Sequence, residues 1–157
     1  MLALLAFVGH AGASPSASAA QAPDYQVPIP PAQPAPTPYL TPIPIVRLAG
    51  SINRRGSRIK MLSITSPRGS KVTVRCAGGR RKGCPYSRKT ATSPKNRKVR
   101  FRTLERFLKT GVVLRVYVVR GNTVGKYTSF KIRRNRAPAR NDACLYPGDP
   151  TEPRGCS

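Results

Sequence analysis

The sequence predicts an all-β domain, a sandwich of about seven short strands. Apolar and polar residues alternate with a period of two in several segments, which places one face of each segment in a core. β-branched residues are frequent in these segments, and turn signals rich in glycine, proline and asparagine recur about every 8 to 12 residues. Together these observations favour antiparallel sheets over a helical domain.

Six segments carry this alternation. The clearest is 71–76, where Val72 and Val74 share one face with Cys76. Turns at 53–56 and 66–69 separate the first three segments, and residues 120–125 join the last two into a hairpin. One stretch, 103–111, has a short helical pattern that Gly111 ends. In chain order the predicted strands are 45–52, 58–65, 71–76, 98–102, 114–119 and 126–133.

The chain before the first strand has two parts. Residues 1–22 resemble a signal peptide, because the short apolar run LALLAFV precedes two A-x-A cleavage sites, although no Lys or Arg comes before it. Seven apolar residues cannot cross a bilayer, which needs about 20, so no transmembrane span is predicted. Residues 23–44 include nine prolines, which indicates either an extended polyproline II spacer or a disordered leader with no spacing role. We therefore expect the β domain at 45–134 and a C-terminal tail at 135–157.

The charge is strongly unbalanced. The chain has 29 Lys and Arg against 5 Asp and Glu, and 28 of the basic residues fall between Arg47 and Arg140, where Glu105 is the only acid. Such a field attracts anionic partners. A simpler interpretation also stands: 20 of the cations are Arg, which a GC-rich genome favours without selection for binding.

Four cysteines stand at positions 76, 84, 144 and 156. Their spacings are too wide for the paired C-x2–4-C ligands of structural zinc or for a redox C-x-x-C, and the one histidine, His10, lies in the predicted leader. An even number in a small exported domain indicates disulfides. Three pairings are possible, and we predict the sequential one, Cys76 with Cys84 and Cys144 with Cys156, the second loop closing within the tail.

Two stretches carry a resemblance. The stretch LKTGVVLRVYV, residues 108–118, resembles the start of the sixth strand in fibronectin type III and related immunoglobulin-like domains, where a leucine and a glycine form a corner. The order of VRC, GCP, the segment 101–111, the segment 125–134 and the final cysteine loop is similar to small secreted actinobacterial proteins of uncharacterised function. The resemblance implies an immunoglobulin-like sandwich and export, and it implies no activity.

Catalysis is not predicted. An enzyme needs a base near neutral pH, an activated nucleophile or a metal, and the β region has no histidine and a single carboxylate, Glu105, which we expect to be ion-paired. Three further acids, Asp142, Asp149 and Glu152, fall in the predicted tail, where we expect no framework to hold them. No catalytic residue, metal site or cofactor is therefore assigned.

Anion binding is the chemistry that the residues favour, because arginine forks match phosphate and carboxylate oxygens in pairs. We expect Phe101, Phe107 and Phe130 in the core, and Tyr86, Tyr117 and Tyr127 as the aromatics that could be exposed. The predicted partner is an anionic cell-wall polymer or polysaccharide, and the predicted location is extracellular or in the cell envelope. Non-specific nucleic-acid binding, or a structural role without a ligand, are the alternatives. The predicted anion-binding residues are Arg80, Arg81, Lys82, Arg88, Lys89, Lys95 and Arg97, with Lys71, Arg75, Lys98, Arg100 and Arg102 as outward additions.

Overall fold

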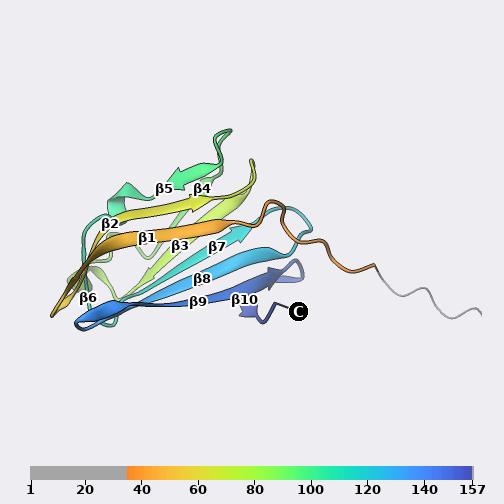
Figure 1. Cartoon of the computed structure of the whole chain (residues 1–157). Coiled ribbons are helices and arrows are strands. Elements are labelled where there is room, and N and C mark those ends of the chain that lie inside the picture. Colours follow the sequence, from red (N-terminus) through yellow and green to blue (C-terminus); the bar gives the residue numbers. More distant parts are fainter. Residues whose placement is uncertain (1–34, 157) are drawn as a thin grey trace, which may run out of the picture. The chain divides into compact units, whose positions relative to one another are not determined.

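A computed structural model of the chain describes residues 35–156, which form ten strands in two antiparallel sheets (Figure 1). The predicted signal peptide, 1–22, and the first part of the proline-rich segment, 23–34, lie outside the described residues. The all-β class predicted from the alternation of residues is confirmed. The assignment to the immunoglobulin-like class stays a prediction.

The first sheet is built around its longest strand, β2 (Gly56–Thr65). One edge of β2 pairs with β1 (Ile45–Asn53), and the other edge pairs with two short strands, β5 (Lys98–Arg100) and β6 (Phe107–Lys109). Because β5 and β6 occupy opposite halves of the same edge, the chain between them runs along that edge of β2, with hydrogen bonds from Phe101 to Leu62 and from Ile59 to Arg106.

The second sheet has six strands in the order β10-β9-β8-β7-β3-β4. Its centre is the pairing of β3 with β7 and of β7 with β8, which runs without a break in register over most of their length. In Figure 1 β3 runs behind β1 and β2, and β8, β9 and β10 lie below β1. Its strands are β3 (Lys71–Ala77), β4 (Arg88–Thr92), β7 (Val113–Val119), β8 (Gly125–Arg133), β9 (Arg136–Tyr146) and β10 (Asp149–Arg154).

One hydrophobic core fills the space between the two sheets. Leu62 and Ile64 enter it from β2, and Val72 and Val74 enter it from β3, all four with no exposed surface. Their partners on the inward face of β7 include Leu114, which is equally buried. The period-two faces predicted from sequence are therefore the faces that pack, and burial of each such side chain contributes about 1.5–3 kcal/mol.

The structure has more strands than the seven or so predicted. β4 was missed because all but one of its residues are exposed at a sheet edge, where no buried alternation is required. The stretch 103–111, for which a short helix was expected, contains only the end of a 3-10 turn at Arg102–Leu104 and then β6. Leu104 and Leu108, both within that stretch, are buried in the core, the first from the turn and the second from the strand.

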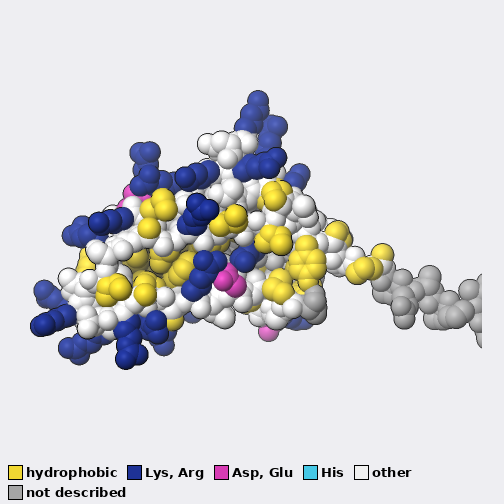
Figure 2. All heavy atoms as spheres, viewed as in Figure 1, with side chains coloured by type: hydrophobic (Ala, Val, Ile, Leu, Met, Phe, Trp, Pro, Cys, Tyr) yellow, Lys and Arg dark blue, Asp and Glu magenta, His cyan; other side chains and the backbone are white. Residues whose placement is uncertain are grey.

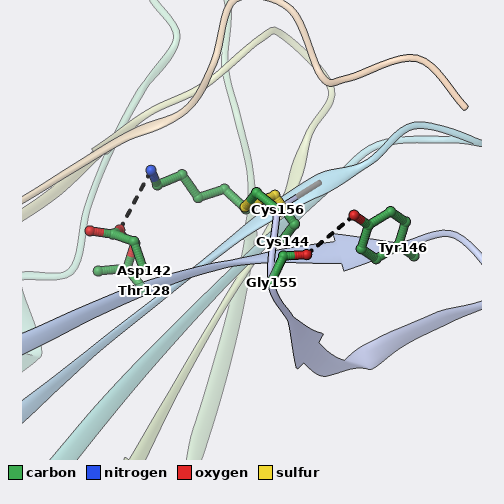
Figure 3. The surroundings of a disulfide bond; sticks show 7 residues. Thr128, Asp142, Cys144, Tyr146, Gly155 and Cys156 are labelled. Atoms are coloured by element: carbon green, nitrogen blue, oxygen red, sulfur yellow. Dashed lines mark hydrogen bonds and ion pairs between the residues drawn. A yellow bond between two sulfur atoms is a disulfide. The ribbon is translucent and has the colours of Figure 1, made fainter.

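The predicted tail is also part of the second sheet. β9 pairs with β8 from Arg136 to Leu145, so the strands continue well past the predicted boundary at residue 134. The disulfide Cys144–Cys156 and a hydrogen bond of 3.2 Å from the Tyr146 hydroxyl to the Gly155 carbonyl hold the chain end against β9 (Figure 3). The expectation that the acids of this segment have no framework is therefore wrong for Asp142, which stands on β9.

The domain also begins before the predicted residue 45. Leu40 is buried, its amide donates to the Val124 carbonyl at 3.0 Å, and the Val124 amide donates to the Pro38 carbonyl at 2.9 Å. The last residues of the proline-rich segment thus pack on the turn between β7 and β8 instead of forming a spacer without a core.

Candidate anion-binding surface

The loop between β3 and β4 is closed by the disulfide Cys76–Cys84, which confirms the predicted pairing together with Cys144–Cys156. Inside the loop, residues Arg80–Lys82 form a single 3-10 turn, η1, and all three cations are exposed. The amides of Lys82 and Cys84 both donate to the Gly79 carbonyl, at 3.1 and 3.2 Å. The disulfide and these bonds hold the three cations in one turn.

Two glycines determine where this loop lies. Gly83 has φ of +99°, and a Cβ atom there would stand 2.3 Å from the Phe107 carbonyl oxygen, so the loop rests directly on the backbone of β6. The Lys82 ammonium nitrogen lies 3.7 Å from the place that a Cβ atom would take on Gly111. Lys82 therefore lies over the turn between β6 and β7.

Around Lys82 the surface forms a hollow of about 950 Å³, which we name the basic hollow. Five cations line it, contributed by four separate segments: the β1–β2 turn, η1, β6 and the β8–β9 turn. No carboxylate is among its lining residues. Figure 2 shows Lys and Arg side chains gathered at this left-hand end of the domain. The lining residues are Asn53, Arg54, Arg55, Lys82, Phe107, Lys109, Thr110 and Arg134.

Backbone hydrogen bonds tie the turns around the basic hollow to one another. The Thr110 amide donates to the Arg55 carbonyl at 3.0 Å, and the Asn135 amide donates to the Asn53 carbonyl at 3.2 Å. The Asn53 side chain also accepts from the Arg55 amide at 3.1 Å. The cations of the hollow consequently project from a connected frame, and Phe107, which is half-buried instead of in the core as expected, supplies an aromatic surface.

The predicted anion-binding residues do not gather in one place. Arg80, Arg81 and Lys82 belong to η1, whereas Arg88 and Lys89 stand on β4. Lys95 and Arg97 lie in the β4–β5 loop, whose Ser93 and Arg97 carbonyls accept hydrogen bonds from the β2–β3 turn. That turn and loop lie at the end of the sandwich opposite the β1–β2 turn (Figure 1). Of the seven predicted residues only Lys82 lines the basic hollow.

Four cations of the hollow, Arg54, Arg55, Lys109 and Arg134, were not selected from sequence. Arg54 and Arg55 form a pair and Lys109 stands alone in the chain, whereas Arg134 lies in the basic stretch 131–136, which was not selected either. The available signal was topological: in antiparallel sheets, alternate turns come to the same end, and three of these four residues are in turns.

None of the four described acids lines the basic hollow, and each of them has a hydrogen-bonding partner elsewhere. Arg100 Nη2 donates to Glu105 Oε2 at 3.0 Å, and this hydrogen bond is the main cause that lowers the pKa of Glu105. Glu105 is therefore ion-paired, as expected. Asp142 accepts from Thr128 and Arg140, each at 2.7 Å.

The three tyrosines that could have been exposed differ in their burial. Tyr127 is buried, with 7% of its surface exposed, while Tyr86 and Tyr117 are half-buried. Each of the latter carries a cation over its ring: Lys89 Nζ lies 5.8 Å from the Tyr86 centroid, and Arg75 Cζ lies 5.2 Å from the Tyr117 centroid. Burial raises the pKa of Tyr86. Aromatic rings thus help to position Lys89 and Arg75.

All four cysteines are in disulfides, and within residues 35–156 no cluster of three or more His, Cys, Asp or Glu side chains could hold a metal ion. The described part of the chain also contains no helix with the length and hydrophobicity that crossing a bilayer requires. Comparison of the chain with protein-family models, with curated proteins and with solved structures found no match.

Proposed function

We propose that this chain is an exported, non-enzymatic β-sandwich that binds an anionic polymer, of the cell wall or an acidic polysaccharide, through the basic hollow. The observation that carries the proposal is the convergence of five cations from four chain segments on one hollow that no carboxylate lines. Five fixed charges in one place produce a local field that a long anionic chain meets at several of its groups at once.

The hollow also has the dimensions of a binding site. Its volume of about 950 Å³ falls at the upper end of the range of about 300–1,000 Å³ typical of ligand sites. Arg54, Arg55 and Arg134 offer planar forks that bind two oxygens of a carboxylate or phosphate, and Lys82 and Lys109 add point charges. Arg80 and Arg81, exposed in the same 3-10 turn as Lys82, extend the surface along which a polymer would lie.

Export is supported by the cysteines. Both disulfides join residues near each other in sequence, and disulfides of this kind persist in oxidising compartments outside the cytoplasm. The leader-like residues 1–22 point in the same direction. An exported protein with this charge meets the anionic polymers of its own envelope first, which is why we place it there.

The absence of enzymatic activity is proposed from the titratable groups. The chain has one histidine, outside the described residues. The four described carboxylates each lie within hydrogen-bonding distance of an arginine or a threonine, and none lines the basic hollow. A site composed of cations, one asparagine, one threonine and one phenylalanine binds anions but lacks a general base.

The experiment that tests the proposal compares two variants of equal charge. The first, Arg54→Gln/Arg55→Gln/Arg134→Gln, removes three cations of the basic hollow. The second, Arg68→Gln/Lys95→Gln/Arg120→Gln, removes three exposed cations from turns at the opposite end. Each protein is co-sedimented with isolated bacterial cell wall at 50 and 200 mM salt, with a short DNA duplex as competitor.

We expect the first variant to lose at least tenfold in affinity for the wall and the second to lose little. A purely electrostatic contact of six or more charges weakens about a thousandfold across this salt range, by analogy with DNA binding. Equal losses in the two variants would overturn the proposal, because they would show that only net charge matters. Complete transfer to the DNA duplex would replace the wall polymer by nucleic acid as the partner.

A further inference from the structure

The outward face of the second sheet carries another hollow, separate from the basic hollow. Its volume is about 180 Å³, and it lies over β4, β3 and β7, bordered by the first residues of β10. This volume is below the range of about 300–1,000 Å³ that drug-sized ligands occupy, so it suits one small chemical group. Its lining residues are Lys71, Thr73, Arg75, Arg88, Thr90, Tyr117, Val119, Pro150 and Thr151.

Three arginines stand in a row across the strands beneath this hollow, and two of them, Arg75 and Arg88, line it. Arg75 on β3 stands directly opposite Arg88 on β4 and directly opposite Arg115 on β7. Neighbouring strands are about 4.8 Å apart, so the three side chains leave the sheet side by side. Like charges in directly opposite positions destabilise a sheet. An anion bound between them would reverse that repulsion.

The chain does not supply this anion from its own described residues. The four described carboxylates have other partners, and none of them forms an ion pair with Arg75, Arg88 or Arg115. These pairs are Glu105 with Arg100, Asp142 with Arg140 and Lys126, Asp149 with Thr151, and Glu152 with Arg154.

Arg75 is the best-positioned of the three. Its guanidinium lies over the Tyr117 ring, with Cζ 5.2 Å from the centroid, and Tyr117 in turn packs edge-on against Tyr127 at 5.1 Å. Its Nε atom is buried and has no hydrogen-bond partner among the described residues. A buried donor without an acceptor costs free energy, so Arg75 gains from a shift of its guanidinium that brings this N–H to an acceptor in the hollow.

A neutral donor completes the arrangement. Thr73 Oγ1 and Thr90 Oγ1 are 3.1 Å apart, between the strands that carry Arg75 and Arg88. When one hydroxyl donates to the other, the accepting hydroxyl keeps its own hydrogen free for a third group. The hollow therefore offers two guanidinium forks and one hydroxyl donor, with Lys71 at its far end.

We propose that this hollow binds a phosphate group, with Arg75 and Arg88 as its principal ligands. A tetrahedral dianion has enough acceptor oxygens for two forks and a hydroxyl, whereas a carboxylate has only two oxygens. The proposal goes beyond polymer binding at the basic hollow, because it uses different residues on a different surface and stands whether or not that polymer is bound.

The test follows the arginine Nε–H signals of the full-length ¹⁵N-labelled chain by NMR during titration. The probes are inorganic phosphate, glucose 1-phosphate and acetate, at constant ionic strength. We expect saturable shifts of the Arg75 and Arg88 signals with phosphate and none with acetate. Saturation with both phosphates identifies the free ion as sufficient, and saturation with glucose 1-phosphate alone identifies a phosphate ester as the ligand.

Arg75→Gln and Arg88→Gln should each weaken phosphate binding at least tenfold, while Arg47→Gln, the same change on the first sheet, should leave it unchanged. Arg88 is exposed on an edge strand, so its variant keeps the test valid if Arg75→Gln does not fold. The variant Arg54→Gln/Arg55→Gln/Arg134→Gln should bind phosphate normally, which separates this site from the basic hollow. Shifts that do not saturate, or that acetate reproduces, would overturn the proposal.

Discussion

Thr128 Oγ1 donates a hydrogen bond of 2.7 Å to Asp142 Oδ1, and the two residues stand directly opposite each other on β8 and β9. Thr128 has no exposed surface, whereas 39% of the Asp142 side chain is exposed. Arg140 donates to the other carboxylate oxygen at 2.7 Å, and Lys126 Nζ lies 3.5 Å from Oδ1. Figure 3 labels Thr128 and Asp142, which lie next to each other. Asp142 thus holds β9 to β8 in a region where the strand has few apolar residues.

We predict that Thr128→Val destabilises the domain by about 1 kcal/mol, the net value of one hydrogen bond. Valine has nearly the shape of threonine, so the core remains filled while Asp142 loses its buried donor. Urea unfolding at neutral pH measures the change. Ser129→Ala, on the outward side of the same strand, is the control and should cost less; an equal loss would show that the hydrogen bond is not the cause.

Asp142 should also make stability depend on pH in the acid range. Burial tends to raise its pKa, but hydrogen bonds from Arg140 and Thr128 and the charges of Lys126 and Arg140 lower the pKa to about 2, from an ordinary value of 3.8. Because the folded pKa is the lower one, the carboxylate contributes stability above about pH 4 and loses it as the pH falls from 4 to 2.

The measurement compares the native chain with Asp142→Asn by urea unfolding at pH 6 and again at about pH 2. We expect a difference in unfolding free energy at pH 6 that is largely lost at the lower pH, because Asp142 is then protonated in the unfolded chain and about half protonated in the folded one. A difference of the same size at both values would contradict the prediction and assign the effect to the shape or hydrogen bonding of the side chain.

The fold was predictable where a strand has a buried face of its own. Val72, Val74 and Cys76 repeat at the strand period and are all buried, so β3 was found with nearly its correct ends. β9 was missed because Pro138 and a run of polar residues leave no alternation of apolar and polar residues before Cys144 and Leu145. Its place in the sheet depends on pairing with β8 and on the contacts of Asp142, which are tertiary information.

The candidate site was predictable only in part, for the same reason. Lys82 was selected because it stands in a dense basic run inside a disulfide loop. Arg55, Lys109 and Arg134 join it only because the β1–β2 turn, β6 and the β8–β9 turn meet at one end of the sandwich. Lys95 was selected by the same density of charge and lies in a loop at the other end.

Removing the disulfide between β3 and β4, by Cys76→Ala/Cys84→Ala, should lower the unfolding free energy by about 2.6 kcal/mol, the chain-entropy value for a loop of this length. Removing the other, by Cys144→Ala/Cys156→Ala, should lower it by about 2.9 kcal/mol on the same basis. Only the first change frees η1, so only the first should also weaken binding to isolated cell wall. Equal weakening by both would show that the disulfide does not act through Lys82 and its neighbours.

The contact of Gly83 with β6 predicts unequal effects of two alanine substitutions in the same loop. Gly79 has φ of +73° and open space around it, so Gly79→Ala should cost about 1–3 kcal/mol for backbone conformation alone. Gly83→Ala has this cost and also forces the loop away from the Phe107 carbonyl, because its Cβ atom would lie 2.3 Å from that oxygen. Urea unfolding should show the larger loss for Gly83→Ala, and its amide exchange should be faster around Phe107. Equal losses would mean that η1 does not rest on β6 and that Lys82 is not held at the basic hollow.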